Sequence, residues 1–119
     1  MTGRIKISTA LLIAAKNGLV KAVKKILDDI PVSIHDQLLI EKKNIVHVAI
    51  EERQSEVLEE VKKRKHKHWL VLREKLDADG NNALHLAAKQ SKYIASGIQS
   101  GTIMQMQWEI LWFEVVFIY

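Results

Sequence analysis

The chain carries one pattern of apolar and polar positions three times. Each copy opens with Thr or Asn, continues with apolar residues and has a small alanine at its sixth position, in the stretches Thr9 to Ala14, Asn44 to Ala49 and Asn82 to Ala87. Successive copies are separated by 35 and 38 residues. Thr and Asn side chains accept backbone N–H bonds at helix starts, and a small residue allows a neighbouring helix to approach closely. The pattern therefore predicts one helix that recurs, starting near residues 9, 44 and 82.

A second apolar pattern follows the first two copies and predicts a partner helix. Gly18 is suited to the left-handed turn that ends a helix, and Val23 and Ile26 then follow at helical spacing. Leu58 and Val61 repeat these two positions 35 residues later. Each repeat is thus expected to be a pair of antiparallel helices.

The third copy is preceded by a turn signal, Asp77-Ala-Asp-Gly80-Asn81. Gly80 can adopt a positive φ, and the Asp and Asn side chains can hydrogen-bond to their own backbone. A turn followed by two helices, with a period near ~33 residues and a start similar to Thr-Pro-Leu-His-x-Ala, resembles the ankyrin repeat. The resemblance implies an all-α ankyrin-repeat solenoid of about three degenerate repeats, approximately 5–38, 40–76 and 77–119, in a single domain covering 1–119.

The histidines of the pattern are expected to be structural. His47 and His85 fall on the same repeat position, where Leu12 stands in the first copy. In ankyrin repeats this imidazole hydrogen-bonds to the backbone and ties adjacent turns together. No second ligand recurs at a fixed spacing from either histidine, so we assign them neither metal binding nor catalysis. The residues expected to form the repeat signature are Thr9, Ala14, Gly18, Asn44, His47, Ala49, Gly80, Asn82, His85 and Ala87.

The C-terminal part carries a closer resemblance. The stretches LLIAAKNG, EKKNIV and GNNALHLAAK precede, in this order, a loop with Gly97 and Gly101 and the tryptophan-rich stretch MQWEILWFE. Together they resemble the last repeats of plant membrane ankyrin proteins of the accelerated-cell-death type, which carry a PGG domain. The resemblance implies a plant protein of stress or defence signalling, tethered on the cytosolic side of a membrane. Since the Pro-Gly-Gly motif and its membrane helices do not follow, we expect a truncated member or a fragment.

The last predicted helix starts at about Thr102 and replaces the third repeat's outer helix. Its apolar runs between Glu109, Glu114 and the end are far shorter than the ~20 residues that span a bilayer. One side is expected to cap the stack, and the other to present a surface for a partner or for self-association. The candidate contacts on this surface are Trp112, Phe113 and Phe117.

The positive charge of the chain is local. The net charge is +4, and one acid-free run contains five cations: Lys62, Lys63, Arg64, Lys65 and Lys67. This run is expected to form the solvated end of the second outer helix, where cations suit the negative helix C-terminus. The alternative is a nuclear-targeting or phosphate-binding patch in a basic nucleic-acid-binding module. Further candidate contacts for a partner are therefore Lys62, Lys63, Arg64 and Lys65.

Composition narrows the function further. The chain has no cysteine, which excludes disulfides, thiol nucleophiles and cysteine-ligated zinc or iron–sulfur centres. It has no nucleophile–base pair, Gly-rich phosphate loop or recurring carboxylate pair, and its N-terminus lacks a secretory signal. We therefore expect an intracellular, non-catalytic protein that binds other proteins and uses no cofactor or metal.

Overall fold

The computed structural model describes residues 2–88. In this range the chain forms a stack of helices without strands. The helices are α1 (Thr2–Lys16), α2 (Val20–Asp29), the 3-10 helix η1 (Pro31–His35), α3 (Ile45–Glu51), α4 (Ser55–Arg64) and α5 (His66–Glu74). A further helix occupies residues 83–88, at the end of the described range. The all-α repeat fold predicted from the sequence is confirmed.

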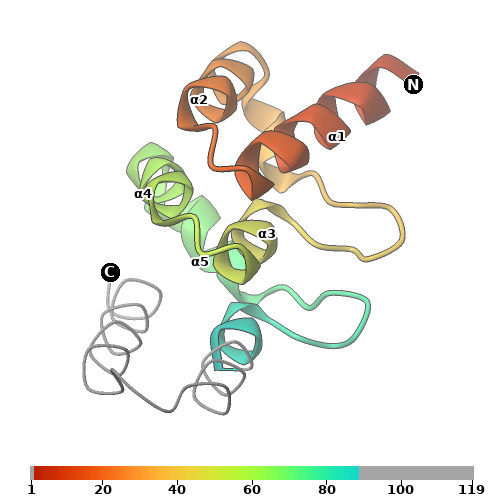
Figure 1. Cartoon of the computed structure of the whole chain (residues 1–119), viewed down its shortest axis with the longest axis vertical. Helices are drawn as coiled ribbons and strands as arrows, with labels where there is room; N and C mark the ends of the chain where they lie inside the picture. Colours follow the sequence, from red (N-terminus) through yellow and green to blue (C-terminus); the bar gives the residue numbers. More distant parts are fainter. Residues whose placement is uncertain (1, 89–119) are drawn as a thin grey trace, which may run out of the picture.

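The helices form two columns (Figure 1). α1, α3 and the helix at 83–88 make one column beside two long loops, while α2 and α4 lie on the side away from these loops. α1 packs against α2 and α3, and α4 also packs against α2 and α3. Each column therefore stacks the equivalent helices of successive repeats, with the inner helices next to the loops.

Asparagine side chains start two of the three inner helices, as predicted. Asn44 Oδ1 accepts hydrogen bonds from the backbone N–H groups of Val46 and His47, at 2.9 and 3.1 Å. In return, His47 Nδ1 accepts the Asn44 N–H at 3.0 Å. Asn82 and His85 form the same reciprocal pair, at 3.0 and 3.1 Å. These bonds satisfy N–H groups that have no partner within a helix.

The first inner helix starts earlier than the sequence predicts. α1 begins at Thr2, and Thr9 lies inside it, with its Oγ1 donating a hydrogen bond to the Ile5 carbonyl at 2.9 Å. The prediction of a helix start near residue 9 is wrong, because no proline or turn sequence separates residues 2–8 from the apolar pattern. Thr9 is therefore a helix-interior residue that bonds back to the preceding turn, not a cap.

Residues with a positive φ follow α1 and α3. Gly18 has a φ of 71°, and Arg53, 35 residues later, has a φ of 54°. One residue beyond each of them, the backbone N–H bonds back to the helix, at 2.9 Å to the Ala14 carbonyl and at 2.8 Å to the Ala49 carbonyl. The same helix-ending turn thus forms with glycine in the first repeat and without it in the second.

α5 is a helix that the sequence pattern does not predict. α4 ends at Arg64, and Lys65 is extended, with φ −151° and ψ 121°, so residues 62–68 do not form one solvated helix end as expected. Trp69 and Leu72 of α5 are fully buried, and α5 packs against α3 and α4. The burial of these two apolar side chains against the stack favours the break between α4 and α5.

The three signature alanines lie in the core. Ala14, Ala49 and Ala87 are all buried, together with aliphatic side chains of α1 to α5 and η1. Small side chains at these positions let the inner helices approach one another. Several predicted features lie outside the described residues: the outer helix of the third repeat, the loop with Gly97 and Gly101, and the candidate contacts Trp112, Phe113 and Phe117.

Candidate functional site

His47 is buried and joins the start of α3 to the chain that leaves α5. Its Nε2 lies 2.8 Å from the Lys75 carbonyl oxygen and donates to it, because Nδ1 already accepts the Asn44 N–H. Asn44 Nδ2 adds a bond to the Leu72 carbonyl at 3.1 Å. Burial lowers the pKa of His47, against the opposing effects of the Lys75 bond and the nearby Asp77. Both ring nitrogens are used by the backbone, so the imidazole acts as a structural tie.

Asp77 is buried and organises the loop before the helix at 83–88. Its Oδ1 accepts the backbone N–H groups of Asp79 and Asn81, both at 2.9 Å. Lys43 Nζ lies 2.5 Å from Glu51 Oε1 and 3.9 Å from Asp77 Oδ2. Burial acts to raise the pKa of Asp77, but the two N–H bonds and the Lys43 charge outweigh burial and lower it. The carboxylate therefore stays ionised and holds the loop in its turn.

Two loops, residues 37–44 and 75–82, project beside the inner helices (Figure 1), and we call them the first and second finger. An isolated bridge between Gln37 and Asn44 closes the first finger at its base. The Ala78 N–H donates a hydrogen bond to the Glu41 carbonyl at 2.9 Å and so joins the two fingers. The fingers therefore form one continuous edge along the stack.

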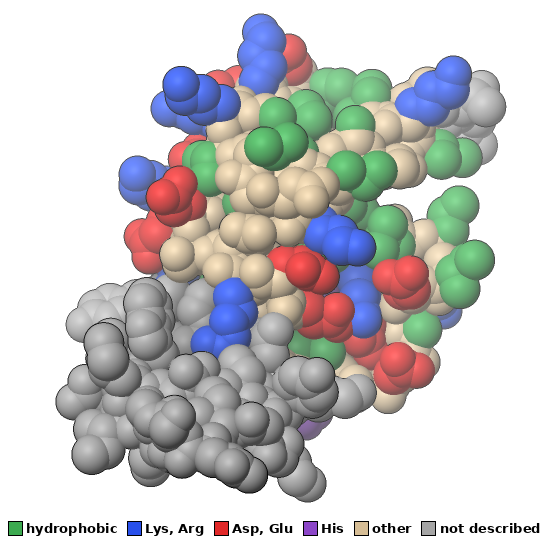
Figure 2. All heavy atoms as spheres, viewed as in Figure 1, with side chains coloured by type: hydrophobic (Ala, Val, Ile, Leu, Met, Phe, Trp, Pro, Cys, Tyr) green, Lys and Arg blue, Asp and Glu red, His purple; other side chains and the backbone are tan. Residues whose placement is uncertain are grey.

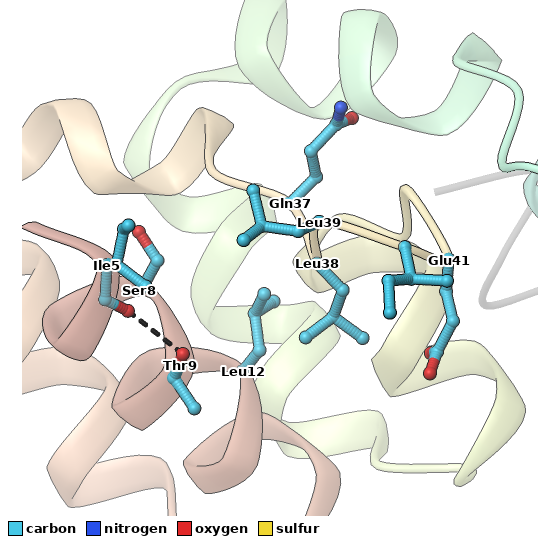
Figure 3. A pocket seen from close by; sticks show the side chains of 9 residues that line it. Ile5, Ser8, Thr9, Leu12, Gln37, Leu38, Leu39 and Glu41 are labelled. Carbon is cyan, nitrogen blue, oxygen red and sulfur yellow. Dashed lines mark hydrogen bonds between the residues drawn. The ribbon is translucent and has the colours of Figure 1, made fainter.

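A groove separates α1 from the first finger. Its first cavity has a volume of about 260 Å³ and includes Ile5 and Leu12 of α1 and Leu38 of the finger. Figure 3 shows Leu12 and Leu38 in the space between the two elements. A second cavity, of about 310 Å³, shares Thr9, Leu12, Leu38 and Glu41 with the first and extends toward the C-terminal end of α1. We call the two cavities together the finger groove.

Large aliphatic side chains are exposed around the finger groove. Leu39 and Ile40, at the tip of the first finger, are 76% and 88% exposed, and Ile5 and Ile13 on α1 are about half exposed. Figure 2 shows hydrophobic side chains on the finger side of the molecule, next to acidic and basic ones. None of these four residues was singled out by the sequence pattern. For Leu39 and Ile40 the sequence does carry a signal, the apolar stretch Leu38 to Ile40.

The structure divides the basic run between inward and outward side chains. Lys62 Nζ lies 4.6 Å from the centroid of the Trp69 ring, and burial lowers the pKa of this lysine. The Arg64 guanidinium bonds to Asp28 of α2 at 2.7 Å. Two of the four candidate contacts in this run therefore help to pack α4 against α5 and α2. The other two are exposed: Lys63 and Lys65.

Neither a metal cluster nor a membrane-spanning helix is found in residues 2–88. No group of three or more His, Asp or Glu side chains in this range is arranged to hold a metal ion. The helices of the same range are too short or too polar to cross a bilayer.

Comparison with known proteins identifies the repeat. Residues 11–96 match the family model described as Ankyrin repeats (3 copies). No curated protein and no solved structure matches the chain. The matched range includes the asparagine caps, His47 and both fingers. The family model therefore covers every element that shapes the finger groove except the first turns of α1.

Proposed function

Because the chain belongs to the ankyrin-repeat family, we propose that it is a non-catalytic module that binds another protein on the face made by the inner helices and the fingers. Ankyrin repeats are generally protein–protein interaction modules. Repeat stacks bind along an extended surface, because each repeat adds a similar set of side chains to the same face.

The exposed aliphatic edge of the finger groove carries this proposal. Leu39 and Ile40 on the first finger and Ile13 on α1 surround a cavity pair that is open to solvent. Exposed apolar patches beside polar residues mark interaction sites on soluble domains. Lys16 and Glu52 line the same groove and supply a polar border, as is usual at the rim of a protein interface.

We extend the proposal to a setting in plant stress or defence signalling, inside the cell and on the cytosolic side of a membrane. The support is the resemblance of the stretches LLIAAKNG, GNNALHLAAK and MQWE to membrane ankyrin proteins with a PGG domain. The same resemblance supports a contact surface in the C-terminal stretch, used for a partner or for self-association, with Trp112, Phe113 and Phe117 as its proposed residues.

Site-specific photocrosslinking in plant extract tests the binding face. A photoreactive phenylalanine analogue placed at Ile13, which lines the groove, is expected to give discrete protein adducts. The same analogue at Val32, an exposed residue of η1 that lines neither cavity of the groove, serves as the matched control. Equal labelling from the two positions would reject this face as the binding site.

A further inference from the structure

The tip of the first finger is apolar although the fold does not need it to be. Counted back from the helix caps at residues 44 and 82, Leu39 and Ile40 occupy the positions of Asp77 and Ala78 in the second finger. Asp77 forms its turn through its buried side chain. Leu39 and Ile40 line the first cavity but are mostly exposed, and neither belongs to the buried core. Their aliphatic character therefore has no role in the core, and contact with a partner explains it.

The backbone holds this apolar tip in place. In the first finger the Leu38 N–H donates to the Lys43 carbonyl, and the Lys42 N–H donates to the Leu38 carbonyl, both at 2.9 Å. Lys42 has a φ of 56°, the left-handed conformation that Gly80 adopts at the equivalent position. A tip fixed by backbone bonds presents its side chains without a large ordering cost on binding.

The charges that line the groove are unequal. Lys43 is held by Glu51 and Asp77, so its positive charge is already matched within the protein. Glu41 and Glu52 are exposed and have no ion pair in the described part of the chain. Both line the second cavity, and Glu41 lines the first as well.

Lys16 is the remaining cation of the groove. It can balance one of these two carboxylates, so the residues that line the groove include three acids, Glu41, Glu51 and Glu52, and two cations, Lys16 and Lys43. The apolar groove therefore has a negative border. Since complementary charge selects partners and speeds their association, this border favours a basic partner over an acidic one.

We propose that the finger groove binds a peptide segment of a partner protein in which aliphatic side chains stand next to Lys or Arg. The aliphatic side chains would fill the cavities beside Leu12 and Leu38 and cover Leu39 and Ile40. The basic side chain would pair with Glu41 or Glu52. This inference rests on the proposed protein-binding function and names the chemistry of the partner.

Binding of two synthetic peptide pools to the full chain tests the inference. Both pools contain the same Leu and Ile residues in randomised order, and one has Lys where the other has Glu. Fluorescence polarisation is expected to show the Lys pool binding at least about tenfold more tightly. The double substitution Glu41→Lys and Glu52→Lys is expected to reverse this preference, because it makes the border positive.

All of these substitutions are at exposed residues, so we expect the variants to keep the fold. Circular dichroism checks this. Leu39→Ser with Ile40→Ser is expected to abolish binding of the Lys pool. Val32→Ser, the control at a largely exposed aliphatic residue outside the groove, should leave this binding unchanged.

Equal binding of the two pools, no binding of either, or an unchanged preference after charge reversal overturns the inference. None of these results removes the proposed function, which the Ile13 crosslink tests separately. Analytical ultracentrifugation tests for a second copy of the chain in the groove. A wild-type dimer that becomes a monomer in the variant with Leu39→Ser and Ile40→Ser would show that the groove binds a second copy, and would overturn the inference.

Discussion

At the scale of single residues, His47 makes the stability of the fold depend on pH. Burial lowers the pKa of its imidazole below the ordinary value of 6.5, so the folded state favours the neutral ring. In the unfolded chain the ring is solvated and takes up a proton near pH ~6.5. The stabilisation that His47 provides is therefore complete above that pH and is lost as the pH falls toward the folded-state pKa.

Replacement of His47 by Leu, the residue at this position in the first repeat, is expected to destabilise the chain. It leaves the buried N–H of Asn44 and the carbonyl of Lys75 without their partner, at a cost of roughly 1–3 kcal/mol. Urea denaturation at about pH 7.5 and about pH 5.5 measures this cost, which should shrink at the lower pH because wild type then loses the contribution of His47. A cost independent of pH would contradict the assignment. His85 is the equivalent residue of the third repeat and is exposed, so His85→Leu is expected to reduce the stability less than His47→Leu does.

Substitution of Gly18 and Gly80 by alanine distinguishes two causes of lost stability, the left-handed backbone conformation and a steric clash. Gly18 and Gly80 have φ of 71° and 78°, so Ala at either position loses roughly 1–2 kcal/mol from the left-handed conformation. A Cβ at Gly18 would also lie 2.5 Å from Gln54 Oε1, whereas a Cβ at Gly80 meets nothing within 4 Å. Gly18→Ala should therefore destabilise more than Gly80→Ala in urea denaturation.

The hydrogen bond from Gln54 Nε2 to the Lys16 carbonyl, at 2.9 Å, accounts for the expected difference between the two glycines. The added methyl group displaces the Gln54 side chain and breaks this bond. In a Gln54→Ala background the two substitutions should have equal cost, and a difference that persists there would point to another cause.

At the scale of helices, the sequence pattern predicts helix starts well where interactions between neighbouring residues determine them. The Asn caps and the alanine spacing located the starts of α3 and of the helix at 83–88. The break at Lys65 was missed because it depends on distant contacts, namely the burial of Trp69 against the stack and the bond from Arg64 to Asp28. The sequence of the basic run, residues 62–67, is compatible both with one long polar helix and with two short helices.

The candidate site was predicted less well than the helices. The finger groove exists because the first finger folds back along α1, and only the structure shows that Leu39 and Ile40 point outward there. In the sequence the same two residues are as compatible with a core strand or a buried turn as with an exposed tip. Most residues of the repeat signature, in contrast, lie in an inner helix or at its cap, where spacing along the sequence is informative.

Trp69 should be the side chain on which α5 depends. Trp69→Ala removes the largest fully buried side chain of the described range and the contact with Lys62, at a cost of roughly 3–5 kcal/mol. Val71→Ala, two positions further on the exposed side of the same helix, should cost less than about 1 kcal/mol. Thermal melts followed by circular dichroism compare the two, and similar melting temperatures would mean that α5 is not an integral part of the stack.

At the scale of the whole molecule, each repeat is stabilised chiefly by its neighbours. α3 packs against α1 on one side and against α4 and α5 on the other, so the second repeat links the first to the rest. In such a linear array, stability is close to a sum of repeat and interface terms. A defect in the second repeat should therefore weaken both interfaces at once.

Ala49→Glu tests this dependence. Ala49 is fully buried in α3, and a glutamate there would place an unpaired charge where two helices meet, at a cost above about 4 kcal/mol. Domains of this size have roughly 5–15 kcal/mol of stability, so the variant should lose most of its helical signal at neutral pH and recover part of it in mild acid, where the carboxyl is protonated. Ala78→Glu, on an exposed alanine of the second finger, is the control and should melt like wild type. A folded Ala49→Glu variant with an unchanged melting temperature would mean that the inner helices do not meet at this alanine, and the stacking that shapes the finger groove would have to be abandoned.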